Sequence, residues 1–158
     1  MNLFEGGGHE LDLRNGATEV LVEVLMLAVT ALARQGWEYG FAAELARQDQ
    51  HLMGRGTVGL RLEDLDWGPD PEQGRAFALA VVDLALTRHR WDELGYHPPY
   101  TEGHLRTLRR MIEDTRPTAV PASGAAADPA EVTAACCVRH RVLTPLAWYP
   151  ACVFCGRG

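Results

Sequence analysis

The chain has 158 residues, of which 47% are apolar and 23% charged, and its formal net charge is −6 at pH 7. This length fits one globular domain with room for a small appendage, and the composition excludes a disordered, collagenous or low-complexity chain. The acidic balance argues against a protein that binds nucleic acid or anionic membranes over its whole surface, and the absence of lysine excludes Schiff-base chemistry and a P-loop lysine.

The N-terminal third of the chain carries no targeting or membrane signal. Residues 1–16 are acidic and glycine-rich, without the basic region that opens a secretory signal peptide. The most apolar stretch, residues 20–33, contains Glu23 and is shorter than the roughly 20 residues of a membrane-spanning helix. All four cysteines lie between Cys136 and Cys155, whereas a disulfide-stapled secreted protein spreads them through the fold. We therefore expect a cytoplasmic protein without a membrane segment.

Two short segments have strand character, one near the start of the chain and one in its middle. Apolar and polar residues alternate at positions 11–13 and again at 58–62, which predicts two strands. We expect them to pair as a small two-stranded β element. The glycine-rich segment before the first of these strands, residues 6–9, is expected to be mobile and to belong to a flexible N-terminus.

Helical patterns dominate the rest of residues 1–116. Asn15 or Thr18 is expected to cap a first helix that runs to about Arg34 and is closed by Gly36. This helix is apolar around most of its circumference, which predicts a central core helix, with a homodimer face as the alternative. A second helix is predicted over residues 37–52.

Two further helices have clear start and stop signals. Asp70 as N-cap and Pro71 at the first helical position begin a third helix, whose apolar spacing continues to Trp91 and whose expected stop is Gly95. Thr101 is expected to cap a fourth helix that ends at Arg116. The predicted fold is therefore mainly α, with four main helices.

The composition changes sharply after this domain. Residues 117–130 are rich in proline and alanine and contain no side chain larger than valine, so we predict a linker. Residues 131–158 contain every cysteine, three arginines and one glutamate. We therefore divide the chain into an α-rich domain (1–116), a linker (117–130) and a Cys/His tail (131–158).

The tail contains two potential metal-binding turns. Cys137-x-x-His140 is followed, after eleven residues, by Cys152-x-x-Cys155. Two ligands separated by two residues converge on one ion, and two such turns can complete a tetrahedral site. Three thiolates and one imidazole suit a structural Zn²⁺.

Cys136 is the alternative to Cys137, because in a helix it would lie one turn from His140. A redox pair at Cys152 and Cys155 is a weaker interpretation, since the chain lacks a βαβ pattern. An iron–sulfur cluster is also weaker, since two adjacent cysteines ligate such a cluster poorly.

Two features favour an interaction with another protein. An acidic loop surrounds an aromatic residue, which suggests a docking surface for a basic partner; helix-capping and solvated carboxylates are the structural alternative. Aromatic residues of the tail exceed what so small a module can cover, so they pack on the helices or contact a partner. The candidate partner-binding residues are Glu63, Asp64, Asp66, Trp67, Asp70, Trp148 and Tyr149.

These features predict a small intracellular protein-interaction module, an adaptor or a neutralising, immunity-type subunit. The first alternative is a metal- or histidine-dependent enzyme built around His89, Glu93, His97 and His104, although no nucleophile or phosphate-binding motif accompanies them. The second alternative is a nucleic-acid adaptor that uses the arginines of the zinc tail. We assign no catalytic residue.

Overall fold

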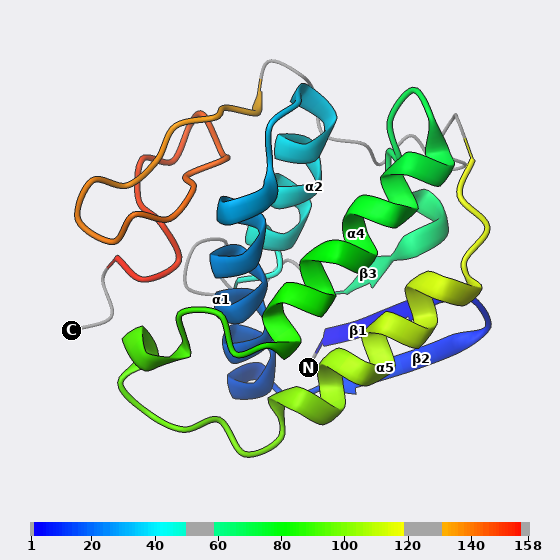
Figure 1. Cartoon of the computed structure of the whole chain (residues 1–158), viewed down its shortest axis with the longest axis horizontal. Helices are drawn as coiled ribbons and strands as arrows, with labels where there is room; N and C mark the ends of the chain where they lie inside the picture. The colour runs from blue at the N-terminus through cyan, green and yellow to red at the C-terminus, as the bar shows by residue number, and fades with distance from the viewer. Residues whose placement is uncertain (1, 50–58, 119–130, 156–158) are drawn as a thin grey trace.

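A computed structural model describes residues 2–49, 59–118 and 131–155. Over these ranges the protein is mainly α, with four α-helices and one small three-stranded sheet (Figure 1). The prediction of a mainly α fold with four helices is confirmed. The predicted linker lies outside the described residues except for its first two positions.

Helix α1 (Asn15–Leu32) forms the centre of the molecule. Its residues 21, 22 and 24–29 are at most 1% exposed, because α2 (Gly36–Ala46), α4 (Pro71–Leu86) and α5 (Thr101–Asp114) all pack against it. The predicted core helix is thereby confirmed, and the helix is buried within one chain.

The ends of α1 differ from the prediction. Arg14 occupies the N-cap position, and the hydroxyl of Thr18 donates to the Arg14 carbonyl oxygen from inside the first turn. The helix ends at Leu32, and Gly36 begins α2 instead of closing α1. A capping box between Gln35 and Glu38 starts this second helix immediately, which leaves no room for a longer α1.

The N-terminal cap of α4 is confirmed, but its predicted C-terminal end is wrong. Asp70 accepts a hydrogen bond from the Gln73 backbone N–H, and Pro71 is the first helical residue. The helix stops at Leu86 because Arg88 and Arg90 both adopt left-handed backbone conformations, with φ of 63° and 60°. The chain then turns through the 3-10 helix η3 (Trp91–Leu94), and the Trp91 side chain enters the core.

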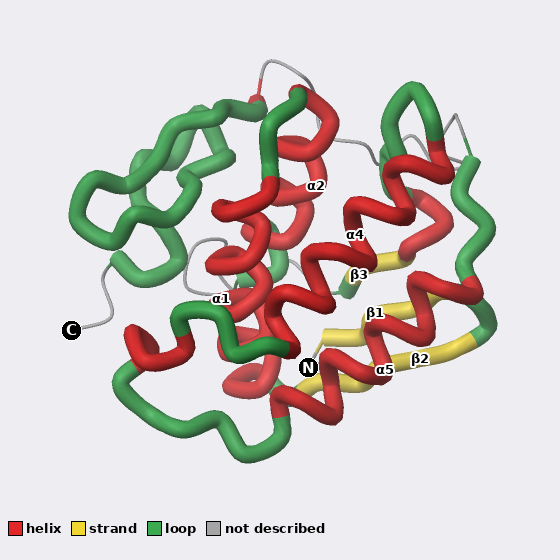
Figure 2. Tube along the Cα trace, viewed as in Figure 1, coloured by secondary structure: helices red, strands yellow, loops and turns green. Residues whose placement is uncertain are grey.

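The sheet has one strand more than predicted. Strands β1 (Asn2–Gly6) and β2 (His9–Leu13) form an antiparallel hairpin, and β3 (Leu60–Arg61) pairs with β1 in parallel. The expected direct pairing of the two predicted strands is therefore wrong, because β1 lies between them. Gly7 and Gly8, both with positive φ, make the hairpin turn, so the expected mobile start is ordered. Helix α5 covers the hairpin (Figure 2).

Helix α2 ends at Ala46, earlier than predicted, and residues 50–52 of its predicted range lie outside the described residues. Residue 58, the first position of the second predicted strand, also lies outside them. Residues 131–155 lie on the far side of α1 from the sheet (Figure 1). Their apolar side chains join the core of the helical domain: Val142, Leu143, Leu146 and Val153.

Candidate metal centre

A short antiparallel ladder positions the first metal-binding turn. Segments 131–137 and 142–147 pair through backbone hydrogen bonds, such as Thr144 N–H to Ala135 O at 2.8 Å and Cys137 N–H to Val142 O at 2.8 Å. The chain reverses between them, where the Arg141 N–H donates to the Cys137 carbonyl at 2.7 Å. This turn carries both Cys137 and His140.

The second turn is built in the same way. The Cys155 N–H donates to the Cys152 carbonyl oxygen at 3.0 Å, so both thiols project from one tight loop. Cys152 is buried against the helical domain, whereas Cys155 is partly exposed. The two turns face each other.

Four potential ligand atoms meet between the turns. The Nδ1 atom of His140 lies 3.6 Å from the sulfur of Cys137, 3.3 Å from that of Cys152 and 3.5 Å from that of Cys155. The Cys155 sulfur is 3.8 Å from that of Cys137 and 3.7 Å from that of Cys152. All four atoms lie within 4.8 Å of one another, so the structure brings together the four residues that sequence spacing singled out.

Cys136 does not belong to this cluster. Its side chain is exposed, and its thiol faces the Cys137 carbonyl oxygen at 3.8 Å. Residues 131–137 are extended and not helical, which directs adjacent side chains to opposite sides. The backbone therefore selects Cys137 as the member of the pair that faces the other thiols.

The thiols of the cluster have different electrostatic environments. The backbone N–H of His140 lowers the pKa of the Cys137 thiol to about 6, whereas burial raises the pKa of the Cys152 thiol to about 12. Three thiolates at these distances repel one another, so full ionisation of the group requires a positive charge between them. A bound divalent cation provides that charge and favours the thiolate form of all three.

Residues of the helical domain hold the first turn in place. The Arg90 guanidinium donates to the His140 carbonyl oxygen at 2.8 Å and to the Arg141 carbonyl oxygen at 2.9 Å. Glu93 orients Arg90 through two hydrogen bonds of 2.5 and 3.0 Å. The Thr30 hydroxyl of α1 accepts a hydrogen bond from the Leu143 N–H. Sequence reasoning missed Arg90 and Thr30, since no local motif links them to the tail.

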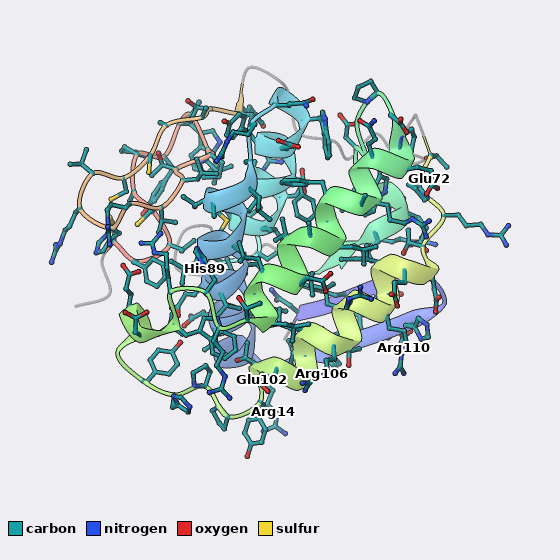
Figure 3. The ribbon with its side chains drawn as sticks, viewed as in Figure 1. Arg14, Glu72, His89, Glu102, Arg106 and Arg110 are labelled. Carbon is teal, nitrogen blue, oxygen red and sulfur yellow. The ribbon has the colours of Figure 1, made fainter. Side chains whose placement is uncertain are left out.

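Within the described residues, the four residues of the enzyme alternative do not form a cluster that could hold a metal ion. His89 lies in the turn after α4 and not on a helix, so its predicted helical spacing to Glu93 is wrong (Figure 3). Glu93 is bound by Arg90 and Arg141, while the His97 ring lies 3.5 Å from Arg88. Burial lowers the pKa of His104 on α5. Within the ranges that the structure describes, the Cys/His cluster is the one group of three or more side chains that could hold a metal ion.

The carboxylates of the acidic loop have structural roles, of which the sequence predicted only the Asp70 cap. Glu63 accepts a hydrogen bond from the Gly7 N–H of the hairpin, Asp66 accepts one from Gly68, and Asp70 caps α4. Asp64 ends the 3-10 helix η2 (Leu62–Asp64).

The expected role of Trp67 as an exposed aromatic anchor is wrong. Its side chain is 1% exposed, and its indole N–H donates to the Leu62 carbonyl oxygen at 2.9 Å. The indole is buried because it closes the core between η2 and α4. Trp148 remains exposed at 51% and contacts the partly exposed Tyr149 edge to face, at 5.9 Å between ring centroids.

The chain matches no protein-family model, and comparisons with the curated proteins and with the solved structures find no match. In the described residues, no helix has the length and apolar character needed to cross a membrane. The geometry of the Cys/His cluster and of the surfaces around it is therefore the basis for a functional assignment.

Proposed function

We propose that the protein is a small interaction module whose C-terminal segment is held on the helical domain by a structural Zn²⁺. One observation carries the zinc assignment. With Zn–S of about 2.3 Å and Zn–N of about 2.0–2.1 Å, a tetrahedral site has S···S edges of about 3.8 Å and S···N edges of about 3.6 Å. The two S···S distances to Cys155 are 3.7 and 3.8 Å, the three S···N distances are 3.3, 3.5 and 3.6 Å, and the Cys137 and Cys152 sulfurs lie within 4.8 Å of each other.

The ligand count supports a structural ion and not a catalytic one. Cys137, His140, Cys152 and Cys155 would fill all four tetrahedral positions, whereas catalytic zinc keeps one position for water or substrate. Residues 131–155 have little regular structure beyond their short ladder, so metal binding would supply much of their folding energy. Reduced thiolates of this kind fit the reducing conditions of the cytoplasm.

The interaction role is supported by the surface of the protein. The four carboxylates Glu63, Asp64, Asp66 and Asp70 form no ion pair within the described part of the chain. The exposed Trp148 adds an aromatic contact surface on the tail. An adaptor or neutralising subunit that engages a basic partner fits both features.

Elemental analysis of the purified full-length chain tests the metal assignment. We expect about one zinc per chain. The supporting spectroscopic result is a Co²⁺-substituted protein with the intense visible bands of tetrahedral thiolate coordination. A protein that contains iron, or that remains free of metal after zinc is supplied, would contradict the assignment.

A further inference from the structure

A cleft separates the start of α2 from the first strand of the tail ladder. It has a volume of about 290 Å³. Gly36, Trp37, Tyr39 and Gly40 contribute from α2, residues 132–134 contribute from the tail, and Asp66 contributes from the acidic loop. The cleft therefore exists only where residues 131–155 are docked on the helical domain.

The aromatic wall of the cleft is rigid. Trp37 packs edge to face on Phe77, with 5.3 Å between ring centroids, and Gly68 lies against its indole so closely that a Cβ there would be 2.8 Å from the ring. The Tyr39 hydroxyl donates to the Ala33 carbonyl oxygen. Gly36 and Gly40 leave space next to these aromatic rings, because a Cβ on either glycine would have no neighbouring heavy atom within 4 Å. An apolar side chain can therefore enter without rearrangement.

The tail contributes an unpaired strand edge beside this wall. The ladder to residues 142–147 uses the backbone groups of residues 131, 133, 135 and 137. In the described structure no hydrogen bond uses the N–H or C=O of Val132, Ala134 or Cys136. Such an edge is a template for an added strand, whose backbone provides affinity and whose alternate side chains enter pockets.

The charge at the cleft indicates what kind of segment fits. Asp66 is exposed and lines the cleft. In the part of the chain described, neither Asp66 nor the nearby Glu63 and Asp64 forms an ion pair. A bound segment with an arginine or lysine beside its apolar residue would neutralise this charge. The chain's own residues 119–130 contain one aspartate and no basic residue, so they lack that complementarity.

We propose that this cleft binds an extended segment of a partner protein, which adds a strand to the edge at residues 132–136. The segment inserts an apolar side chain between Trp37 and Gly40 and places a basic side chain at Asp66. This inference rests on the proposed function, since it names the partner chemistry of the zinc-held module.

The test uses the zinc-loaded full-length protein and an array of synthetic octapeptides. Each peptide has a central leucine, isoleucine, valine or phenylalanine, flanked by arginine, glutamine or glutamate. We expect the arginine set to bind at least about tenfold more tightly than the glutamate set, and Asp66→Asn to reduce this preference. In the complex, the amides of Val132, Ala134 and Cys136 should become protected from hydrogen exchange.

A matched pair of variants identifies the cleft as the binding site. Gly40→Leu fills the cleft and should abolish peptide binding, whereas Gly103→Leu, at an exposed glycine of α5 that also has open space around it, should leave binding unchanged. Zinc content and the helical circular-dichroism signal of both variants are measured in parallel. They show whether a loss of binding comes from the cleft or from a failure of the zinc-held fold itself.

Each of the following results would overturn the inference while the zinc assignment stands. The first is that no octapeptide binds to zinc-loaded protein. The second is that Gly40→Leu binds as well as the unchanged chain. The third is binding without protection of the edge amides. The fourth is that a synthetic peptide of residues 119–130 binds more tightly than the arginine set, or that the protein forms a dimer that Gly40→Leu abolishes.

Discussion

Individual side chains decide which atoms can hold the metal and what keeps them in place. Cys137 and Cys136 are neighbours in the chain, yet only Cys137 faces His140, because the extended backbone directs the Cys136 side chain to solvent. This difference supplies an internal control, since two cysteines with the same local sequence occupy different environments. It separates loss of a ligand from loss of any thiol.

Replacement of a single clustered cysteine should remove the metal. We expect Cys152→Ser to lower zinc affinity by more than about 100-fold, because a side chain that binds the ion directly contributes more than one that only orients a ligand, whose loss costs about 10–100-fold. Cys136→Ser should retain one zinc per chain, since its thiol lies outside the cluster. Competition with a chromophoric chelator measures both affinities. Equal zinc loss in the two variants would show that Cys136 is a ligand.

Arg90 is expected to stabilise the first metal-binding turn. Arg90→Ala removes the hydrogen bonds to the His140 and Arg141 carbonyl oxygens and should cost about 1–3 kcal/mol of unfolding free energy. The left-handed backbone strain at this position is unchanged, since alanine also has a Cβ. Arg106→Ala is the control, because Arg106 is exposed and lies 3.8 Å from Glu102. Urea unfolding of the zinc-loaded proteins compares them, and similar midpoints would argue against this role.

Acid should release the metal, since protons compete with the ion for the ligands. Burial raises the pKa of the Cys152 thiol to about 12, so this thiol must lose its proton to bind zinc. The pKa of the Cys137 thiol is lowered to about 6, so it is already largely ionised at neutral pH. Zinc affinity should therefore rise at least about tenfold per pH unit from about pH 6 to 8. Chelator competition across this range measures it. An affinity independent of pH would contradict thiolate ligation.

At the scale of elements, the sequence signals that succeeded are those carried by adjacent residues. The Asp70–Pro71 start of α4 was predictable because capping depends on residues within one turn. The two metal-binding turns were predictable for the same reason. Strand β1 was not, since Asn2 and Gly6 flank Phe4 on its buried face and hide the apolar alternation.

Other features depend on contacts between distant residues. Trp67 is buried because η2 and α4 close over it, and no local pattern distinguishes such a tryptophan from an exposed one in an acidic loop. Helix α4 ends at Leu86 although the apolar spacing continues to Trp91, because tertiary packing favours a turn at Arg88 and Arg90. Local propensity is overridden at both places.

Two helical glycines of different environment test the packing of α4 and α5. A Cβ on Gly74 would lie 2.0 Å from the Trp67 carbonyl oxygen, so Gly74→Ala should destabilise the protein by about 1–3 kcal/mol or more. A Cβ on Gly103 meets no heavy atom within 4 Å, so Gly103→Ala should stabilise it by about 0.5–1 kcal/mol through helix propensity. Urea denaturation gives both values. Stabilisation by Gly74→Ala would disprove the close approach of α4 to the Trp67 backbone.

At the scale of the whole molecule, the Cys/His cluster lies in a segment, residues 131–155, that shares one core with the helices. Leu143 and Leu146 of the tail are buried in the same cluster as the residues of α1. The tail is also attached by Arg47, which binds Glu131 at 2.9 Å, and by Arg90. The Arg47–Glu131 ion pair is partly exposed and contributes little by itself, so zinc is expected to supply much of the energy that keeps residues 131–155 docked.

Removal of the metal should therefore undock the tail without unfolding the helices. After chelation of zinc, we expect the amides of Cys137 and Thr144 to lose protection from hydrogen exchange, because their bonds belong to the tail ladder. Amides inside α1 and α5 should keep most of their protection, since α4 and the hairpin still pack on them. Hydrogen exchange followed by NMR, before and after chelation, measures both groups. Simultaneous loss of protection throughout the chain would show that the tail and the helices unfold as one cooperative unit. Unchanged protection of the ladder would show that apolar packing, and not zinc, keeps the tail docked.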